Sequence, residues 1–229
     1  MIKGIIFDLD GVLVHTDKFH YQAWKEMADQ EGIYFDEEIN HRLRGVSRLE
    51  SLDIILERAP KKYTGEEKHQ LATFKNNIYV EYLATMGPNN ISNEVINVLD
   101  TLVERGYKLA IGSSSKNAKL ILEKTMLNSY FSVVIDGNLI NNSKPDPEVF
   151  VKAQEQLGLA KQEVIVIEDA LAGIEAAHRG NMKAAAIGDA TNYEGADYYL
   201  DTLNDLLLLL QKENKKWKKL ISFLWSFYS

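Results

Sequence analysis

The sequence lacks cysteine altogether, and this absence excludes disulfide bonds and metal sites built from thiolates. It also lacks a signal-peptide pattern, internal repeats and low-complexity linkers, and we expect the protein in the cytoplasm. Basic residues number 26 against 33 acidic residues, and the formal charge of −7 argues against nucleic acid or an anionic membrane as the main partner. A small anionic substrate stays possible, since it needs only a local basic site.

The composition is that of a globular protein, with 229 residues, 45% of them hydrophobic and 26% charged. Residues 15–88 contain helical patterns only, whereas the remaining sequence alternates between strands and helices. Capping boxes at Ser47 and Thr64, each with a glutamate three residues later, begin two of the helices. We therefore predict an α/β fold, with a parallel-sheet core formed by residues 1–14 and 89–229 and an inserted helical cap domain formed by residues 15–88.

Two carboxylates follow the first apolar run, at Asp8 and Asp10. Residues two apart in a strand share a face, which puts their Cα atoms about 6.6 Å apart. Gly11 then permits a tight turn. Like charges at the end of a buried strand are costly without compensation, and a divalent cation such as Mg²⁺ favours oxygen ligands. The pattern predicts a magnesium site at this strand end.

Polar side chains follow two other predicted strands as well. A strand over 107–112 leads into the loop 113–117, whose hydroxyls, backbone N–H groups and helix start favour an anion. An apolar strand over 164–167 is followed by Glu168 and Asp169, the same arrangement as after the first strand. Ligands of open parallel sheets gather beyond the carboxyl ends of the strands, so we expect these groups to share one site.

Several further candidates have a plain structural alternative. Lys144 stands before two closely spaced prolines that would hold a functional lysine firmly, but it could be an ordinary surface lysine. Arg44 and Arg48 flank a helix start that suits a phosphate, although surface arginines are common. His20 and Trp24 lie four apart on one helix face, where packing explains them equally well.

The string FDLDGVL, followed in order by the serine loop, Lys144 and the second acid pair, resembles the haloacid dehalogenase-like superfamily over the whole core. Within it, the chain is similar to the β-phosphoglucomutase family. The residues that carry this likeness are Thr16, His20, Trp24, residues 43–48, Lys75, Asn76, residues 113–117 and residues 143–145. The resemblance implies a Rossmann-like core with a helical cap over its active site.

The resemblance also implies a reaction. It is the interconversion of β-D-glucose 1-phosphate and glucose 6-phosphate, through an aspartyl phosphate and β-glucose 1,6-bisphosphate. Asp8 would be the nucleophile and Asp10 the general acid/base. Ser113 and Lys144 would hold the transferring phosphoryl oxygens, and Lys144 would offset their charge.

One Mg²⁺ per active site is implied by the same likeness. Its ligands would be the Asp8 carboxylate, the Asp10 backbone carbonyl, Glu168 and Asp169. Arg48 would bind the distal phosphate, while Thr16, His20 and Lys75 would couple cap closure to the position of Asp10. The implied substrate-binding residues are Thr16, His20, Trp24, Gly45, Val46, Ser47, Arg48, Ser51, Lys75, Ser114, Ser115, Lys116 and Asn117.

Two alternatives stay open. One is a Mg²⁺-dependent sugar-phosphate phosphatase with the same nucleophile and water as acceptor, although Arg48, Lys75 and His20 favour the mutase. The other is a non-catalytic sugar-phosphate sensor, against which the complete set of acids and Lys144 argues. In each case the expected partner is a small sugar phosphate. We expect a monomer, with a dimer left open.

Two segments depart from the family pattern or go beyond it. The asparagine-rich loop 137–142 departs from the pattern and could alter how the cap meets the core. The tail 215–228 combines lysines with aromatic residues, a composition found at membrane surfaces, but packing on the core or on a neighbouring subunit is the expected arrangement. The tail is too short and too charged to span a bilayer.

Overall fold

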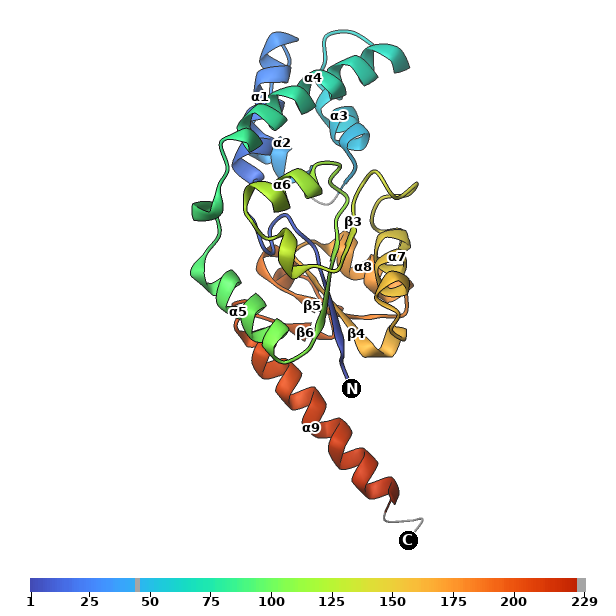
Figure 1. Ribbon diagram of the computed structural model, residues 1–229. Coiled ribbons are helices and arrows are strands. Elements are labelled where there is room, and N and C mark those ends of the chain that lie inside the picture. Colours follow the sequence, from blue (N-terminus) through green and yellow to red (C-terminus); the bar gives the residue numbers. More distant parts are fainter. Residues whose placement is uncertain (44–45, 226–229) are drawn as a thin grey trace.

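The computed structural model describes residues 1–43 and 46–225, with side chains described to residue 215. Within these residues, six parallel strands form one sheet in the order β3-β2-β1-β4-β5-β6, which confirms the predicted α/β class (Figure 1). The strands are β1 (Gly4–Phe7), β2 (Lys108–Gly112), β3 (Val133–Ile135), β4 (Val164–Glu168), β5 (Lys183–Ala186) and β6 (Tyr198–Tyr199).

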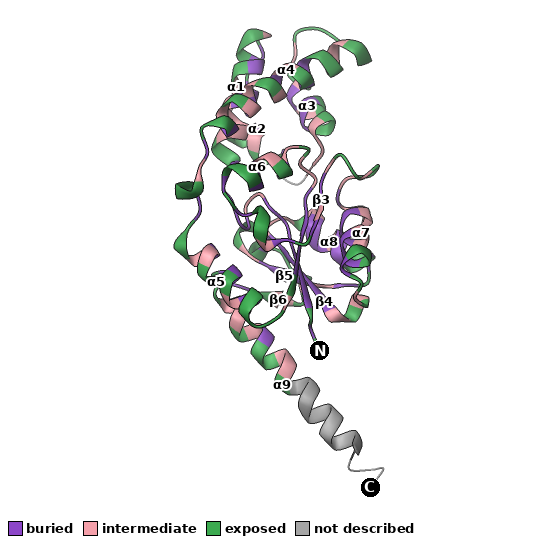
Figure 2. Cartoon of the chain, in the orientation of Figure 1, coloured by how far each residue is buried: buried purple, intermediate pink, exposed green. Residues whose placement is uncertain are grey.

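Helices cover both faces of the sheet. They are α5 (Asn93–Glu104), α6 (Ala118–Lys124), α7 (Glu148–Leu157), α8 (Leu171–Arg179) and α9 (Asp205–Trp225). Successive strand residues point to opposite faces, so Ile5 and Phe7 pack in one layer with α5, α6 and α9, while Ile6 packs in the other with α7 and α8. Figure 2 shows buried residues concentrated in the strands between these layers.

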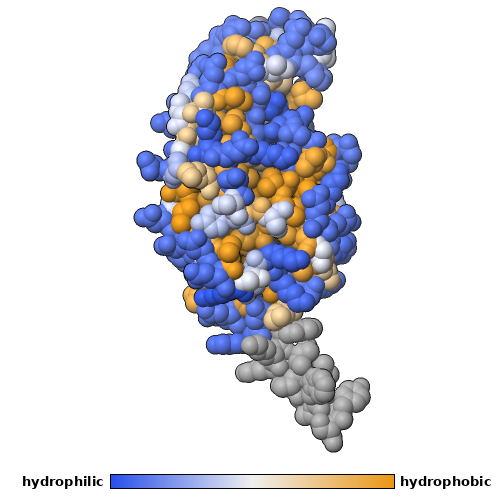
Figure 3. Space-filling model, viewed as in Figure 1, coloured by the Kyte–Doolittle hydropathy of each residue, from blue (hydrophilic) through white to orange (hydrophobic). Residues whose placement is uncertain are grey.

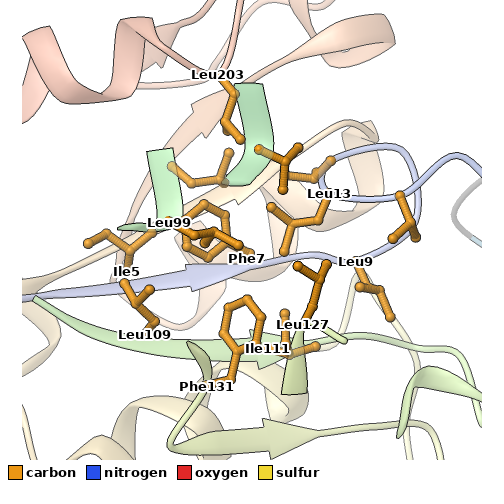
Figure 4. Packing of buried hydrophobic residues seen from close by; sticks show 14 of the residues in the cluster. Ile5, Phe7, Leu9, Leu13, Leu99, Leu109, Ile111, Leu127, Phe131 and Leu203 are labelled. Atoms are coloured by element: carbon orange, nitrogen blue, oxygen red, sulfur yellow. The ribbon is translucent and has the colours of Figure 1, made fainter. Parts of the chain in front are cut away.

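The central strand β1 is buried along its whole length, as its apolar run predicts. Figure 4 shows Ile5, Phe7 and Leu9 pointing into the layer that also contains Leu99 of α5. The ring of Phe7 meets the edge of Phe131 at a centroid distance of 6.2 Å. This packing fixes the strand that leads into the first acid pair.

Four helices form the inserted cap, which lies beyond the carboxyl ends of the strands (Figure 1). They are α1 (Asp17–Gln30), α2 (Glu37–His41), α3 (Arg48–Leu56) and α4 (Gly65–Ala84). The capping boxes at Ser47 and Thr64 are both confirmed, and the cap has an apolar cluster of its own that includes Met27, Leu52 and Ile55. In Figure 3 the viewed face of the cap is mostly hydrophilic, while larger apolar areas lie lower, over the core.

A few elements were not predicted. Helix α2 and the edge strand β6 have only five and two residues, too few to give a periodic pattern. The structure also contains short 3₁₀ helices, which are η1 (Pro88–Asn90), η2 (Asn128–Tyr130), η3 (Lys161–Glu163) and η4 (Gly188–Asn192).

The C-terminal helix α9 starts against the core, where Leu206 and Leu210 are fully buried. The aromatic part of the tail lies beyond the described side chains, so the prediction that it packs stays a prediction. No helix in the described part of the chain combines the length and the apolar character needed to cross a membrane.

Candidate active site

The sheet order places the two acid pairs next to each other. Strand β1 lies between β2 and β4, so the chain changes direction across the sheet between β3 and β4. Such a switch point opens a crevice at the carboxyl ends of the two central strands. Asp8 follows β1 directly and its backbone N–H donates to the carbonyl of Ile167 at 2.9 Å, while Glu168 ends β4 and Asp169 follows it. The predicted convergence of the acids is therefore present.

Lys144 lies between the two strand ends. Its ammonium donates to Oδ1 of Asp8 and to Oε1 of Glu168, the latter at 2.5 Å, and its Nζ stands 4.7 Å from the centre of the Phe150 ring. Asp8 is 7% exposed and Lys144 is 6% exposed. Burial alone would lower the pKa of Lys144, but the charges of Asp8 and Glu168 outweigh it and raise that pKa. Lys144 is therefore a permanent cation inside the site, and not the surface lysine of the alternative interpretation.

Asp10 lies in the turn that follows β1. Its carboxylate accepts a hydrogen bond from the hydroxyl of Thr16, the first residue before α1. Burial raises the pKa of Asp10, and the hydrogen bond from Thr16 partly counters that rise. A raised pKa suits a group that must carry a proton in one step and release it in the next. Gly11 has φ +87°, and a Cβ there would run into the carboxylate of Asp169, so glycine is required at this turn.

The serine-rich loop after β2 is held by its own side chains. The backbone N–H of Ser113 donates to the carbonyl of Ile135 at 3.0 Å. The Ser113 hydroxyl accepts from the N–H of Ser115 at 3.1 Å, and the Ser115 hydroxyl accepts from the N–H of Asn117 at 3.2 Å. Each hydroxyl keeps its own proton, which is free to be donated to a phosphate oxygen.

The acids leave an excess of negative charge that suits a cation. Burial raises the pKa of Asp169 to about 7, with the charge of Glu168 adding to the rise. Burial also raises the pKa of Asp8, against the influence of Lys144 and with that of the neighbouring acids. Among the described residues no three Asp, Glu or His side chains converge tightly enough to bind a metal alone. Mg²⁺ does not need such a cluster, because one or two carboxylates usually hold it together with waters and substrate phosphates. The residues present therefore fit Mg²⁺.

In the cap, Lys75 of α4 is 2% exposed and contacts three side chains. Its ammonium donates to Nδ1 of His20 at 2.9 Å and stands 4.6 Å from the ring centres of both Trp24 and Tyr79. Burial and, to a smaller extent, the charge of Arg48 together lower the pKa of Lys75 to about 7, against the opposing charge of Asp10. Burial and the charge of Lys75 likewise hold the pKa of His20 well below its usual range. No described acid forms an ion pair with Lys75, and Asp10 is the acid whose charge opposes the fall in the Lys75 pKa.

A chain of contacts joins this cluster to Asp10. The backbone N–H of His20 donates to the carbonyl of Thr16 at 3.0 Å, and the Thr16 hydroxyl donates a hydrogen bond to the Asp10 carboxylate. The structure thus brings together Thr16, His20 and Lys75, the three residues predicted to couple the cap to Asp10. Whether they do so during turnover stays a prediction.

Arg48 stands in the first turn of α3, behind the Ser47 cap, and forms no ion pair with any described residue. Its charge reaches both His20 and Lys75, whose pKa values it lowers. The helix dipole and the first backbone N–H groups of this nine-residue helix add to that positive potential. That Arg48 binds a distal phosphate stays a prediction.

The remaining predicted residues fall into four groups. Ser51 is buried in α3 one turn after Ser47, and Val46 is half-buried before the helix. Trp24 belongs to the apolar cluster of the cap and lies beneath Lys75, so it packs there whatever else it does. Gly45 lies outside the described residues. Ser114, Ser115 and Asn117 are half-buried and Lys116 is exposed, all within the loop after β2.

Sequence reasoning missed two contributors. Tyr79 is 1% exposed and stacks on the His20 ring at 4.0 Å, but an aromatic residue on a long helix is usually core; its place one turn after Lys75 was the available signal. Asn138 lies in the asparagine-rich loop and donates to the carbonyl of Lys116 at 2.9 Å. In the structure this loop therefore braces the serine loop within the core.

Comparisons with known proteins agree with this geometry. A family model described as haloacid dehalogenase-like hydrolase matches residues 5–187. The chain is 36% identical over 214 residues to a β-phosphoglucomutase of Bacillus subtilis, covering 93% of this chain and 95% of that one. It is 30% identical over 179 residues to a phosphorylated carbohydrates phosphatase of Thermotoga maritima, covering 77% and 80%. A crystal structure of β-phosphoglucomutase from Clostridium difficile matches with a TM-score of 0.87 and 36% identity, over 95% of this chain and 99% of that one.

Proposed function

Because the chain belongs to the haloacid dehalogenase-like superfamily and, within it, to the β-phosphoglucomutase family, we propose that it interconverts β-D-glucose 1-phosphate and glucose 6-phosphate. One observation carries the proposal. Buried or half-buried cations occur at two separate places, Lys144 beside Asp8 in the core, and Lys75 with Arg48 in the cap. A sugar that carries a phosphate at either end needs such a pair of sites, whereas simple hydrolysis needs only the first.

In the first half-reaction, the phosphorylated Asp8 transfers its phosphoryl group to the 6-hydroxyl of β-glucose 1-phosphate. Asp10 takes the hydroxyl proton while the sugar oxygen bonds to phosphorus and the bond to the Asp8 oxygen breaks. The product is β-glucose 1,6-bisphosphate. Lys144, held on Asp8 and Glu168, balances charge on the transferring group, which is the main requirement of this chemistry.

The second half-reaction runs the same chemistry in reverse on the other phosphate. The bisphosphate turns around, and a carboxylate oxygen of Asp8 attacks the phosphorus at C1. As the bond from phosphorus to the C1 oxygen breaks, Asp10 returns its proton to that oxygen and glucose 6-phosphate is formed. A covalent intermediate on Asp8 thus divides one difficult transfer into two easier ones.

The cap binds the phosphate that is not reacting. Arg48 can grip two phosphate oxygens at once, and Lys75 adds charge from a buried position. When bound, Mg²⁺ would neutralise charge between the acids and the transferring phosphoryl group. Its proposed ligands are the Asp8 carboxylate, the Asp10 backbone carbonyl, Glu168 and Asp169.

A phosphatase that acts on a sugar phosphate is the second candidate. The 30% identity to a carbohydrate phosphatase favours it, because the same nucleophile, lysine and acid pair serve both reactions. In that case Asp10 would activate water in place of a sugar hydroxyl.

A phosphorus NMR time course separates the two. The protein is incubated with β-glucose 1-phosphate, Mg²⁺ and a trace of β-glucose 1,6-bisphosphate. Accumulation of glucose 6-phosphate supports the mutase, and accumulation of inorganic phosphate supports the phosphatase. If neither product forms under any Mg²⁺ concentration, both proposals are wrong.

A further inference from the structure

Asn117 ends the serine-rich loop and stands at the N-cap of α6, where an asparagine side chain normally accepts a hydrogen bond from the first turn. Here its side chain makes no such bond. Its Nδ2 instead donates to the carboxamide oxygen of Asn76 on cap helix α4, at 3.0 Å. The Asn117 side chain thus bonds a cap helix and not the first turn of its own helix.

The backbone on either side of this bond is fixed. On the core side, the N–H of Asn117 donates to the Ser115 hydroxyl, and Asn138 binds the carbonyl of Lys116. On the cap side, α4 is anchored by buried residues one position before Asn76 and three positions after it, Lys75 and Tyr79. What remains free to rotate is the Asn117 carboxamide itself.

A carboxamide nitrogen carries two protons. When Asn76 accepts one of them, the nitrogen is held toward the cap and the second proton stays available. We infer that Asn76 is a positioning residue, which orients the Asn117 carboxamide so that this second N–H binds the distal phosphate of the substrate. The inference rests on the proposed function, because it adds a residue to the distal phosphate site that a mutase requires.

The geometry has a consequence for the cap. Asn76 and Asn117 belong to different parts of the molecule, so their bond forms only when the cap stands close to the core. Asn117 is then correctly oriented only in that arrangement. Phosphate binding at Asn117 and cap closure therefore favour each other.

The chain offers a matched control for Asn76. The next residue on α4, Asn77, is exposed, whereas Asn76 is half-buried. Asn76→Ala and Asn77→Ala make the same chemical change on the same helix. Only the first removes the acceptor of the Asn117 amide.

The test measures the dissociation constant of glucose 6-phosphate by isothermal titration calorimetry, on the full-length, unphosphorylated protein with Mg²⁺. Asn76→Ala should weaken binding by about three- to ten-fold, the value of one hydrogen bond, and Asn77→Ala should leave it unchanged. Asn117→Ala should weaken binding at least as much as Asn76→Ala. The double variant with both Asn76→Ala and Asn117→Ala should match Asn117→Ala alone, because Asn76 acts through Asn117.

Each other outcome has a definite meaning. Effects that multiply in the double variant, an Asn76→Ala affinity equal to wild type, or a wild type that does not bind glucose 6-phosphate would each overturn the inference. A wild type that binds glucose 6-phosphate but forms none of it from β-glucose 1-phosphate in the phosphorus NMR time course, with Mg²⁺ and the trace of bisphosphate present and with the double-variant pattern intact, refutes the mutase and leaves the role of Asn76 standing.

Discussion

The core and the cap each bury one lysine over aromatic rings, and the two lysines differ in their charged neighbours. Lys144 lies between the carboxylates of Asp8 and Glu168, which raise its pKa. Lys75 is equally buried but faces His20 and the charge of Arg48, and its pKa falls to about 7. Burial is therefore not what sets the two groups apart. The charges of the neighbouring residues set the two pKa values. Lys144 stays protonated, whereas Lys75 is expected to become fully protonated only when an anion binds.

This difference divides the work of the proposed reaction. Lys144 is already neutralised by Asp8 and Glu168, so it holds Asp8, the proposed nucleophile, in place before any substrate arrives. Lys75 and Arg48 form no ion pair with a described acid, so these cap cations should gain most when a phosphate binds. A mutase needs both functions, a core that catalyses phosphoryl transfer and a cap that binds the second phosphate of the substrate.

The largest effect is expected at the core. Asp8→Asn removes the nucleophile while keeping its size, so turnover should fall by at least about 10⁴-fold and no phosphoenzyme should be seen in intact-mass spectra. Sugar-phosphate affinity should be kept within a few-fold, because the cap site is untouched. A variant of native circular dichroism that still turns over at the wild-type rate would remove Asp8 as nucleophile.

Removal of Mg²⁺ should also affect the core site. Activity is expected to vanish with a chelator and to return with Mg²⁺, which should also raise the free energy of unfolding by about 2.7 kcal/mol at a hundred-fold excess over its dissociation constant. Asp169→Ala should weaken that stabilisation, and Asp201→Ala, at an exposed acid, should not. Full activity after exhaustive chelation would contradict the proposed metal dependence.

Arg48→Ala tests the cap by itself. Loss of a charged hydrogen-bond partner should weaken sugar-phosphate binding by roughly thirty- to a hundred-fold. Phosphorylation of Asp8 by acetyl phosphate should survive, because this small donor needs no distal site. The control is Arg42→Ala, an exposed arginine of the cap that pairs with Glu57 at 2.7 Å.

Two results of that experiment would break the comparison between core and cap. If Arg48→Ala leaves binding unchanged, the distal phosphate lies elsewhere. If it abolishes phosphorylation by acetyl phosphate, Arg48 acts at the core and the separation of roles is wrong.

Lys75 should make binding depend on pH. Its pKa in the free protein is about 7, and a bound phosphate must raise it, so binding takes up a proton above that pH. Affinity for glucose 6-phosphate should therefore fall as pH rises from 7 to 9, by up to about ten-fold per unit. Lys75→Met should flatten this dependence, whereas Lys68→Met, at a half-buried lysine of the same helix that pairs with Asp53, should keep it. A wild-type affinity that does not change over this range would show that Lys75 is not the group that captures the proton.

The same contrast explains what the sequence could predict. The strands and the acids at their ends could be predicted, because an apolar run followed by carboxylates is a local pattern. Their convergence could be predicted because parallel strands end at the same edge of a sheet. Capping boxes likewise fixed the starts of α3 and α4. The position of Lys144 between Asp8 and Glu168 joins segments more than a hundred residues apart, and only the family resemblance suggested it.

The cap contacts were harder to predict for a physical reason. The bond from Lys75 to His20 joins two helices whose relative placement depends on packing, which no local pattern encodes. The bond from Asn117 to Asn76 was invisible for the same reason, since an asparagine at a helix start is expected to cap its own helix. Tyr79 has the helical spacing of an ordinary core aromatic, so the sequence alone does not predict its contact with His20.

The smallest expected effect concerns that tyrosine, and it is a gain. The Tyr79 hydroxyl is buried and makes no hydrogen bond of normal geometry with a described residue, although the Thr16 side chain lies near it. Its ring stacks on His20. A buried hydroxyl without a partner costs about 1–3 kcal/mol of desolvation that nothing returns. Tyr79→Phe removes this cost and keeps the ring, so the free energy of unfolding in urea should rise by about 1 kcal/mol. Tyr82→Phe is the matched control, because that hydroxyl donates to Glu26 at the surface and its loss should bring no gain. If Tyr79→Phe destabilises the protein, the hydroxyl has a hydrogen-bond partner in solution, with Thr16 as the first candidate.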